Sequence, residues 1–278
     1  MIKMSSAMAT DPGLSREENQ DCVYAQVYQP PDAEPVGLFI VCDGIGSYHF
    51  SCQASRWAVE ALKLELAPLF YSEAPRQALS EHGLESAPNS RAAAVESDPD
   101  LDELVSLVRL ALQNANRKVH GFTQASLFVN GESGTTVTMA VVVGSHVVIA
   151  NVGDSRTYLL RRGKLRQVTK DHSLVASLVA NGHLKNAQAY DHPQRNLILR
   201  ALGQASEIQV DTFVENLQPE DFLVLCSDGL WGMVRDEDFF ASLVSSSKDP
   251  QQACRLLVEA AIEAGGQDNI SVVVVKAA

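Results

Sequence analysis

The chain has 278 residues, 46% of them hydrophobic, with a formal net charge of −12. This length supports one large hydrophobic core, so we expect a single domain over residues 1–278. The negative net charge argues against nucleic acid and anionic membranes as partners, because such surfaces are bound by clustered Lys and Arg. The N-terminal residues contain no signal-like apolar segment, no apolar run is long enough to span a membrane, and the five cysteines form no CxxC pair. We therefore expect a cytoplasmic protein.

The first half of the chain predicts two strands and two helices. Residues 21–29 alternate between apolar and polar side chains, and residues 37–42 are a short apolar run typical of a buried strand. Apolar residues from Ser51 onward recur at helical spacing. Residues 71–100 are rich in Ala, Ser, Glu and Pro, which predicts a surface insertion without a core role. A second helix follows, with one apolar face made by Leu104, Val108, Ala111, Leu112, Ala115 and Val119.

The second half is dominated by predicted strands. Their short connections contain glycine, which favours antiparallel neighbours. Only one further helix is expected, at residues 249–264, with its apolar residues on one face. This pattern indicates antiparallel sheets faced by helices rather than a parallel α/β sheet. The expected strands are residues 135–143, 146–152, 156–160, 165–168, 208–214, 221–226 and 270–275.

Four aspartates stand at the edges of these strands. Asp43, Asp154 and Asp228 follow apolar runs, and Asp268 precedes the last one. Glycine flanks three of the four, and glycine permits both a sharp turn and a close approach of its carbonyl to a ligand. Any single Asp-Gly pair is also a common strand-ending turn. Four such positions favour a shared site.

Carboxylates gathered in one place require cations. Two negative charges a few ångströms apart repel by about 4 kcal/mol at an effective dielectric constant of about 20. An all-oxygen ligand set selects Mg²⁺, Mn²⁺ or Ca²⁺ over Zn²⁺ or Cu. Solubility alone also favours an excess of acidic residues, so the net charge does not decide whether the acidic residues serve solubility or metal binding.

Eight segments, in order, resemble motifs of the PP2C-type metal-dependent protein phosphatases, especially the bacterial serine/threonine phosphatases. The resemblance covers nearly the whole chain apart from the insertion. Eight motifs in the right order are far more specific than one. The segments are GLSREENQD (13–21), VCDGIGS (41–47), SGTTVTMAVV (133–142), NVGDSRTYLL (151–160), TKDHS (169–173), HPQRNLILRALG (192–203), LCSDGLWGMV (225–234) and GGQDNISVVVV (265–275).

This resemblance implies a fold and an activity. The implied fold is α+β, a four-layer α-β-β-α sandwich in which helices flank two antiparallel sheets. The implied activity is hydrolysis of phosphoserine and phosphothreonine in proteins, by a water or hydroxide that bridges metal ions. The substrate would be a phosphorylated protein, the target of a serine/threonine kinase, and the enzyme a cytoplasmic monomer. Residues 173–200 match a flap that borders the catalytic cleft in relatives.

The resemblance also implies a set of metal ligands. Two or three Mn²⁺ or Mg²⁺ ions are expected. Asp43 matches the aspartate that bridges two metals, and Gly44 matches a glycine whose carbonyl helps to bind the second. Asp228 and Asp268 match the remaining direct ligands of the first metal. Asp154 matches an acidic residue that binds a weaker third metal.

Two further residues match positions that act on substrate or water. Arg16 matches an arginine that holds the substrate phosphate, a role suited to a planar guanidinium that contacts two oxygens at once. Asp21 matches a carboxylate that bonds to metal-bound water. Two cations that share a water lower its pKa from 15.7 toward about 7, which makes it a nucleophile for phosphorus. No covalent phosphoenzyme is then required.

The chain departs from the family pattern at five positions, which leaves a second hypothesis open. Gln20 stands where Glu is usual, Ile45 where animal members often have His, and Ser47, Ser51 and Cys52 replace Gly, Gly and Glu. The alternative is a degenerate, weakly active or silent member that binds phosphoproteins as a regulator. We favour the enzyme, because every aspartate that matches a direct metal ligand is present.

Overall fold

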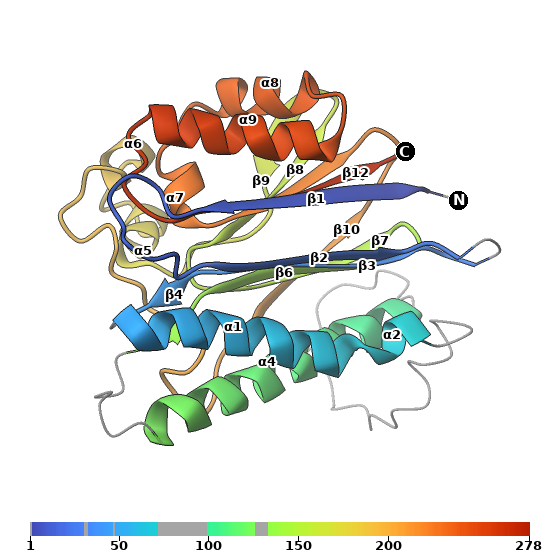
Figure 1. Ribbon diagram of the computed structural model, residues 1–278, viewed down its shortest axis with the longest axis horizontal. Coiled ribbons are helices and arrows are strands. Elements are labelled where there is room, and N and C mark those ends of the chain that lie inside the picture. The colour runs from blue at the N-terminus through green and yellow to red at the C-terminus, as the bar shows by residue number, and fades with distance from the viewer. Residues whose placement is uncertain (1, 31–32, 47, 72–98, 126–132) are drawn as a thin grey trace.

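The computed structural model describes residues 2–30, 33–46, 48–71, 99–125 and 133–278. Two five-stranded antiparallel sheets lie face to face, and helices cover the outer face of each (Figure 1). The four-layer α+β sandwich expected from the sequence is therefore confirmed. Most of the insertion expected at residues 71–100 lies outside the described residues. None of the described helices is both long and apolar enough to cross a membrane.

The first sheet contains both ends of the chain. Its first strand pairs with its last over all eight residues, from Met4 opposite Ala277 to Asp11 opposite Ile270. Asp236 and Asp249 each accept a hydrogen bond from the first turn of a helix that covers this sheet, which explains where these two helices begin. In sheet order, the strands are β1 (Met4–Asp11), β12 (Ile270–Ala277), β11 (Phe222–Cys226), β8 (Arg156–Arg161) and β9 (Lys164–Gln167), and the helices are α8 (Glu237–Ser245) and α9 (Pro250–Glu263).

The second sheet is covered by a pair of long helices, α1 (Tyr48–Leu66) and α4 (Pro99–Ala125). Its strands, in sheet order, are β10 (Asp211–Asn216), β7 (His146–Val152), β6 (Val137–Val143), β3 (Val36–Cys42) and β2 (Cys22–Tyr28). The shorter elements are α2 (Pro68–Tyr71), α5 (Leu174–Ala180), α6 (Asn186–Ala189), α7 (Asp228–Trp231) and a two-stranded pair made by β4 (Gly44–Ile45) and β5 (Gly134–Thr135).

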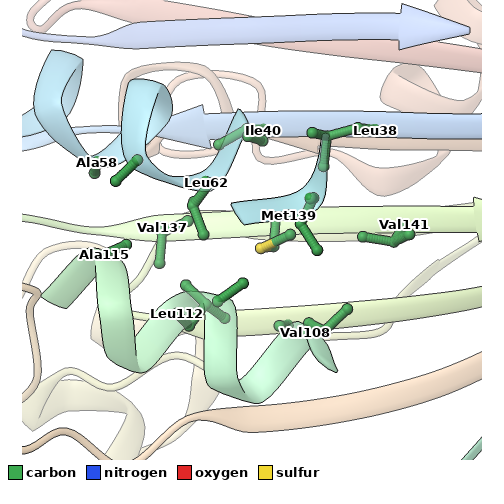
Figure 2. Packing of buried hydrophobic residues seen from close by; sticks show 14 of the residues in the cluster. Leu38, Ile40, Ala58, Leu62, Val108, Leu112, Ala115, Val137, Met139 and Val141 are labelled. Carbon is green, nitrogen blue, oxygen red and sulfur yellow. The ribbon is translucent and has the colours of Figure 1, made fainter. Parts of the chain in front are cut away.

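Strand β3 shows why the apolar runs of this sequence are continuous rather than alternating. Leu38 and Ile40 face the helices α1 and α4 (Figure 2), whereas Phe39 and Val41 pack between the two sheets. A strand buried on both faces needs apolar side chains at every position. The six residues expected on one face of the second helix are all buried in the core beneath α1 and α4.

Several elements differ from the sequence-based expectation, and three of them show the physical reason. The strand expected at residues 208–214 begins only at Asp211, because the carbonyl of Ile208 accepts a hydrogen bond from Gln113 Nε2 instead of joining a ladder. Strand β1 was not expected, since its small and polar side chains lack a strand pattern and β12 supplies the pairing. Helix α8 was also missed; Asp236 caps it and Phe240 and Val244 anchor it to the core.

Candidate active site

Loops from both sheets converge at one end of the sandwich, where β4 and α7 lie (Figure 1). Asp43 directly follows β3, and Asp154 lies in the turn between β7 and β8. Asp228 is the first residue of α7 and is separated from β11 by Ser227, and Asp268 lies two residues before β12. Because alternate strands of an antiparallel sheet end at the same edge, aspartates far apart in the sequence arrive at one place.

The carboxylates face one another closely enough to perturb their protonation. Burial raises the pKa of Asp43 well above its ordinary value, and repulsion from Asp21, Asp228, Asp154 and Asp268 raises it further. Burial and repulsion from Asp268 raise the pKa of Asp228 to about 6, although a hydrogen bond with Asp43 opposes this change. The residues predicted from the sequence as metal ligands thus form a cluster of like charges.

Asp21 lies beneath this cluster and is nearly inaccessible. Its Oδ2 accepts a hydrogen bond from Ser227 Oγ at 2.8 Å, and its Oδ1 has no hydrogen-bond partner among the described residues. Ser227 in turn accepts a bond from the backbone N–H of Ser271, which orients the hydroxyl toward Asp21. Burial, as the largest cause, raises the pKa of Asp21 to about 7.

Asp154 sits on a turn that is held from two sides. The Gly153 N–H donates to His172 Nδ1 at 3.1 Å, and the indole N–H of Trp231 donates to the Asp154 carbonyl at 3.0 Å. Oδ1 of the buried Asp154 carboxylate has no hydrogen-bond partner in the described chain. Burial and repulsion from Asp228 raise its pKa well above the ordinary value.

Arg16 supplies positive charge at the entrance to the site. Its Nη2 lies 2.7 Å from Oδ2 of Asp268, and both side chains are partly exposed. The hydrogen bond with Asp268 raises the pKa of Arg16, and the charges of Asp228 and Asp43 add to the effect. The guanidinium therefore partly neutralises the cluster while remaining accessible to a ligand from solvent.

Two glycines allow the backbone to close around the site. A Cβ at Gly44 would lie 2.4 Å from the Ser51 carbonyl oxygen, and a Cβ at Gly229 would lie 2.0 Å from that of Asn269. Contacts below 3 Å require the backbone to shift. Any larger residue at these positions would separate β4 from α1, or α7 from the loop that carries Asp268.

Asn269 is an organising residue that the sequence did not single out. Its side-chain amide donates to the carbonyls of Pro12 and Glu18, and its Oδ1 accepts from the Gln20 N–H. One side chain therefore fixes the loop that carries Arg16. Its position directly after Asp268, within a segment that resembles a family motif, could have drawn attention to it. The sequence could not reveal its three partners, because they are more than 240 positions away.

The side chains fit hard divalent cations. The unpartnered, buried Oδ1 atoms of Asp21 and Asp154, together with the raised pKa values, show carboxylates that lack positive charge. All candidate donors are oxygens, as Mg²⁺ and Mn²⁺ prefer. Within the described residues, however, no three His, Cys, Asp or Glu side chains stand in ready ligand geometry. Asp268 is directed toward Arg16, which accounts for part of this difference.

Two of the positions that depart from the family pattern, Gln20 and Ser51, lie beside Gly44. Gln20 is fixed through its backbone, since its N–H bonds to Asn269 and its carbonyl accepts from Ser55 Oγ at 2.6 Å. Ser51 is buried beneath Gly44, and Cys52 is partly exposed. Ser47 lies outside the described residues.

The sequence matches the model of one protein family, described as protein phosphatase 2C, over residues 15–261. The chain is 34% identical to the serine/threonine phosphatase stp of Listeria welshimeri over 273 residues, which cover 98% of this chain and 96% of that protein. A relative at this identity and coverage shares the whole domain.

Solved structures agree with the sequence comparison. The crystal structure of the Mycobacterium tuberculosis serine/threonine phosphatase PstP superposes with a TM-score of 0.78 at 29% identity and covers 99% of both chains. The catalytic domain of PstP in complex with two manganese ions superposes with a TM-score of 0.77 at 28% identity, covering 100% of this chain and 99% of that one. The chain is thus similar, over nearly its whole length, to solved serine/threonine phosphatases, one of which contains two manganese ions.

Proposed function

The chain belongs to the protein phosphatase 2C family and is a serine/threonine protein phosphatase, and we propose that the aspartate cluster described above is its catalytic centre. Its substrates are phosphorylated proteins, and the family is metal-dependent. The single observation that carries the proposal is the cluster itself. The cluster contains two buried carboxylates with unpartnered oxygens, Asp21 and Asp154, and an accessible arginine paired with Asp268, which suits a site that binds both cations and a phosphate ester.

Each residue has a role that follows from its position. Asp43, Asp228 and Asp268, with the Gly44 carbonyl, would hold two Mn²⁺ or Mg²⁺ ions, and Asp154 would help to hold a third. The two manganese ions in the related PstP structure support this metal and this number. When bound, the cations would lower the pKa of water and offset the charge of the phosphoryl oxygens.

Arg16 and Asp21 act beside this centre. The Arg16 guanidinium projects from the entrance, where it can donate two hydrogen bonds to a phosphate and orient the ester. Asp21 Oδ1 can accept a proton or a hydrogen bond from water, while Ser227 keeps the carboxylate in place through Oδ2. Holding substrate and nucleophile in a fixed geometry supplies most of the catalysis in phosphoryl transfer.

The remaining expectations concern the oligomeric state, the location and the partners of the protein. We expect a monomer of one phosphatase domain that acts in the cytoplasm on targets of a serine/threonine kinase. We expect no binding to nucleic acid or membranes, which the net charge of −12 supports. The comparisons lend no support to the alternative of a silent phosphoprotein-binding regulator.

The test uses purified protein that has been stripped of metal by a chelator. Readdition of Mn²⁺ or Mg²⁺ should restore hydrolysis of p-nitrophenyl phosphate and of a phosphothreonine peptide. Asp43→Asn should abolish both activities. Asp249→Asn is the matched control, because Asn caps a helix as well as Asp does and Asp249 lies at the start of α9. Full activity of Asp43→Asn, or activity that survives complete chelation, would refute the proposal.

A further inference from the structure

The flap, residues 173–200, is tied to the rest of the protein at its C-terminal end, where Arg200 bonds to Asp211 at 3.1 Å, and through side chains at one point in its middle. The Tyr190 ring meets the Trp231 ring edge-on, with centroids 6.1 Å apart, and the Arg235 guanidinium lies 5.0 Å from the Tyr190 centroid. Asp191 forms an ion pair with Arg235 at 3.2 Å. Within the described residues 182–196, no other side chain makes a hydrogen bond, ion pair or ring contact outside the flap.

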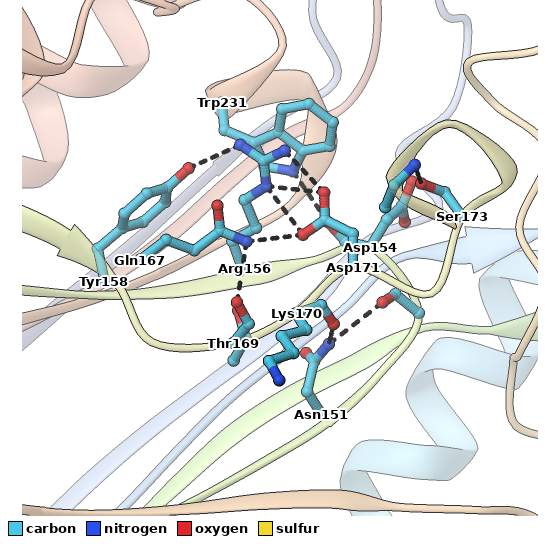
Figure 3. A network of polar contacts seen from close by, with 12 residues as sticks. Asn151, Asp154, Arg156, Tyr158, Gln167, Thr169, Lys170, Asp171, Ser173 and Trp231 are labelled. Carbon is cyan, nitrogen blue, oxygen red and sulfur yellow. Dashed lines mark hydrogen bonds and ion pairs between the residues drawn. The ribbon is translucent and has the colours of Figure 1, made fainter. Parts of the chain in front are cut away.

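Trp231 connects this point to the catalytic centre. It ends the short helix α7 that begins with Asp228, and its indole N–H donates to the Asp154 carbonyl (Figure 3). The Arg156 guanidinium stacks on the indole at 3.5 Å from the centroid. Trp231 therefore contacts the flap through Tyr190, and its other contacts hold the turn that carries Asp154.

The two sides of Trp231 differ in rigidity. Arg156 makes a two-pronged ion pair with Asp171, in which Nε donates to Oδ1 and Nη2 donates to Oδ2, and both side chains are largely buried, so this side is firmly held. On the flap side, the side chains of Asp191 and Arg235 are 77% and 41% exposed. An exposed ion pair and an edge-on ring contact are each weak. The contacts between the flap and Trp231 are therefore weaker than those that hold Arg156 against the other side of the indole.

We propose that Tyr190 is a positioning residue that docks the flap against Trp231 and thereby places the flap to receive the polypeptide of a phosphoprotein substrate. This inference rests on the proposed function, since it assigns the flap a role at the same site. A small phosphate ester has no polypeptide to contact the flap. Loss of the Tyr190 contact should thus raise the KM for phosphoprotein and leave small esters nearly unaffected.

The first measurement compares Tyr190→Ala with Tyr190→Phe, which keeps the ring contact. Loss of one aromatic contact should raise the KM for a phosphothreonine peptide by about threefold to tenfold in Tyr190→Ala, with kcat retained. Tyr190→Phe should behave like the wild type. Equal KM values in the wild type and Tyr190→Ala, or equal damage in both variants, would overturn the proposal.

The second measurement needs neither metal nor substrate, so it separates failure of this proposal from failure of the proposed function. The chain contains two tryptophans, and a Trp57→Phe background leaves Trp231 as the only one. Tyr190→Ala should shift the Trp231 emission to longer wavelength and accelerate tryptic cleavage after Lys185 and Arg195 in the flap. Unchanged emission and unchanged cleavage would show that Tyr190 does not hold the flap.

Discussion

The guanidinium of Arg16 donates to Oδ2 of Asp268 at 2.7 Å, a contact that joins residues 252 positions apart. Asp268 is also a proposed metal ligand, so Arg16 and a cation compete for the same carboxylate. The same arginine is proposed to bind the substrate phosphate. Cation binding would release Arg16 from Asp268 and make its donors available for the phosphate.

Substitution of Arg16 should therefore affect substrate and cation in opposite directions. Arg16→Ala should lower kcat/KM about 10-fold to 100-fold, the usual cost of losing a hydrogen bond to a charged group. It should leave the affinity for Mn²⁺ equal or higher, because Asp268 loses its competing partner. Steady-state kinetics and titration calorimetry measure the two effects. Arg16→Lys should recover part of the activity, since a lysine keeps the charge but not the fork of donors. Weaker Mn²⁺ binding in Arg16→Ala would contradict this account.

Asp43→Asn should abolish activity but make the metal-free protein more stable. The carboxylate of Asp43 is destabilised by burial and by its acidic neighbours, so a neutral amide of the same shape should raise the Tm of the metal-free protein. Thermal melts in chelator at pH 8 test this. Asp249→Ala provides the opposite pattern: it removes the cap of α9 and should cost about 1 kcal/mol of stability without loss of specific activity. A lower Tm for metal-free Asp43→Asn would contradict the prediction.

The metal-free protein should lose stability as the pH rises. The pKa of Asp21 is raised from 3.8 to about 7 in the folded state, so the folded protein retains a proton that the unfolded chain has released. This contribution is complete below about pH 4 and is lost as the pH passes about 7, with a cost on the order of 4 kcal/mol, because each unit of pKa difference corresponds to about 1.4 kcal/mol. The pKa of Asp228, about 6, acts in the same direction.

Melting curves between pH 5 and pH 8 in chelator provide the measurement. Asp21→Asn should flatten the decline and be more stable than the wild type at pH 8. Asp238→Asn, on an exposed position of α8, should leave the decline unchanged. Added Mn²⁺ should raise the Tm most at the higher pH, where the carboxylates are ionised. A metal-free protein that is more stable at pH 8 than at pH 5 would exclude this linkage.

Two glycine-to-alanine substitutions should have opposite effects. In Gly229→Ala, the added methyl would lie 2.0 Å from the Asn269 carbonyl oxygen, which should force α7 away from the Asp268 loop and reduce both stability and activity. Gly121 lies in helix α4 with open space around its Cβ position. Gly121→Ala should raise stability by about 0.5 to 1 kcal/mol with activity unchanged. Urea denaturation and the p-nitrophenyl phosphate assay distinguish the two; normal activity in Gly229→Ala would contradict the close packing.

The sequence by itself determined the strands and helices in which burial of the side chains follows a regular pattern along the chain. Strand β7 was predicted at its observed bounds, because a strand buried on both faces has an apolar side chain at nearly every position. The buried face of α4 was predicted from the helical spacing of its apolar residues. The aspartates were found for a related reason, since each one stands beside an apolar run where a strand begins or ends.

Only the tertiary structure decided which distant groups meet. Strand β1 has no pattern of its own and exists because β12 pairs with it. Ser227 is fixed on Asp21, and Trp231 on both Asp154 and Tyr190, by contacts between loops that no local spacing records. Period and composition report a residue's average environment, whereas hydrogen bonds and ion pairs depend on individual atoms within about 3 Å of each other. Such distances are set by the packing of the whole sandwich.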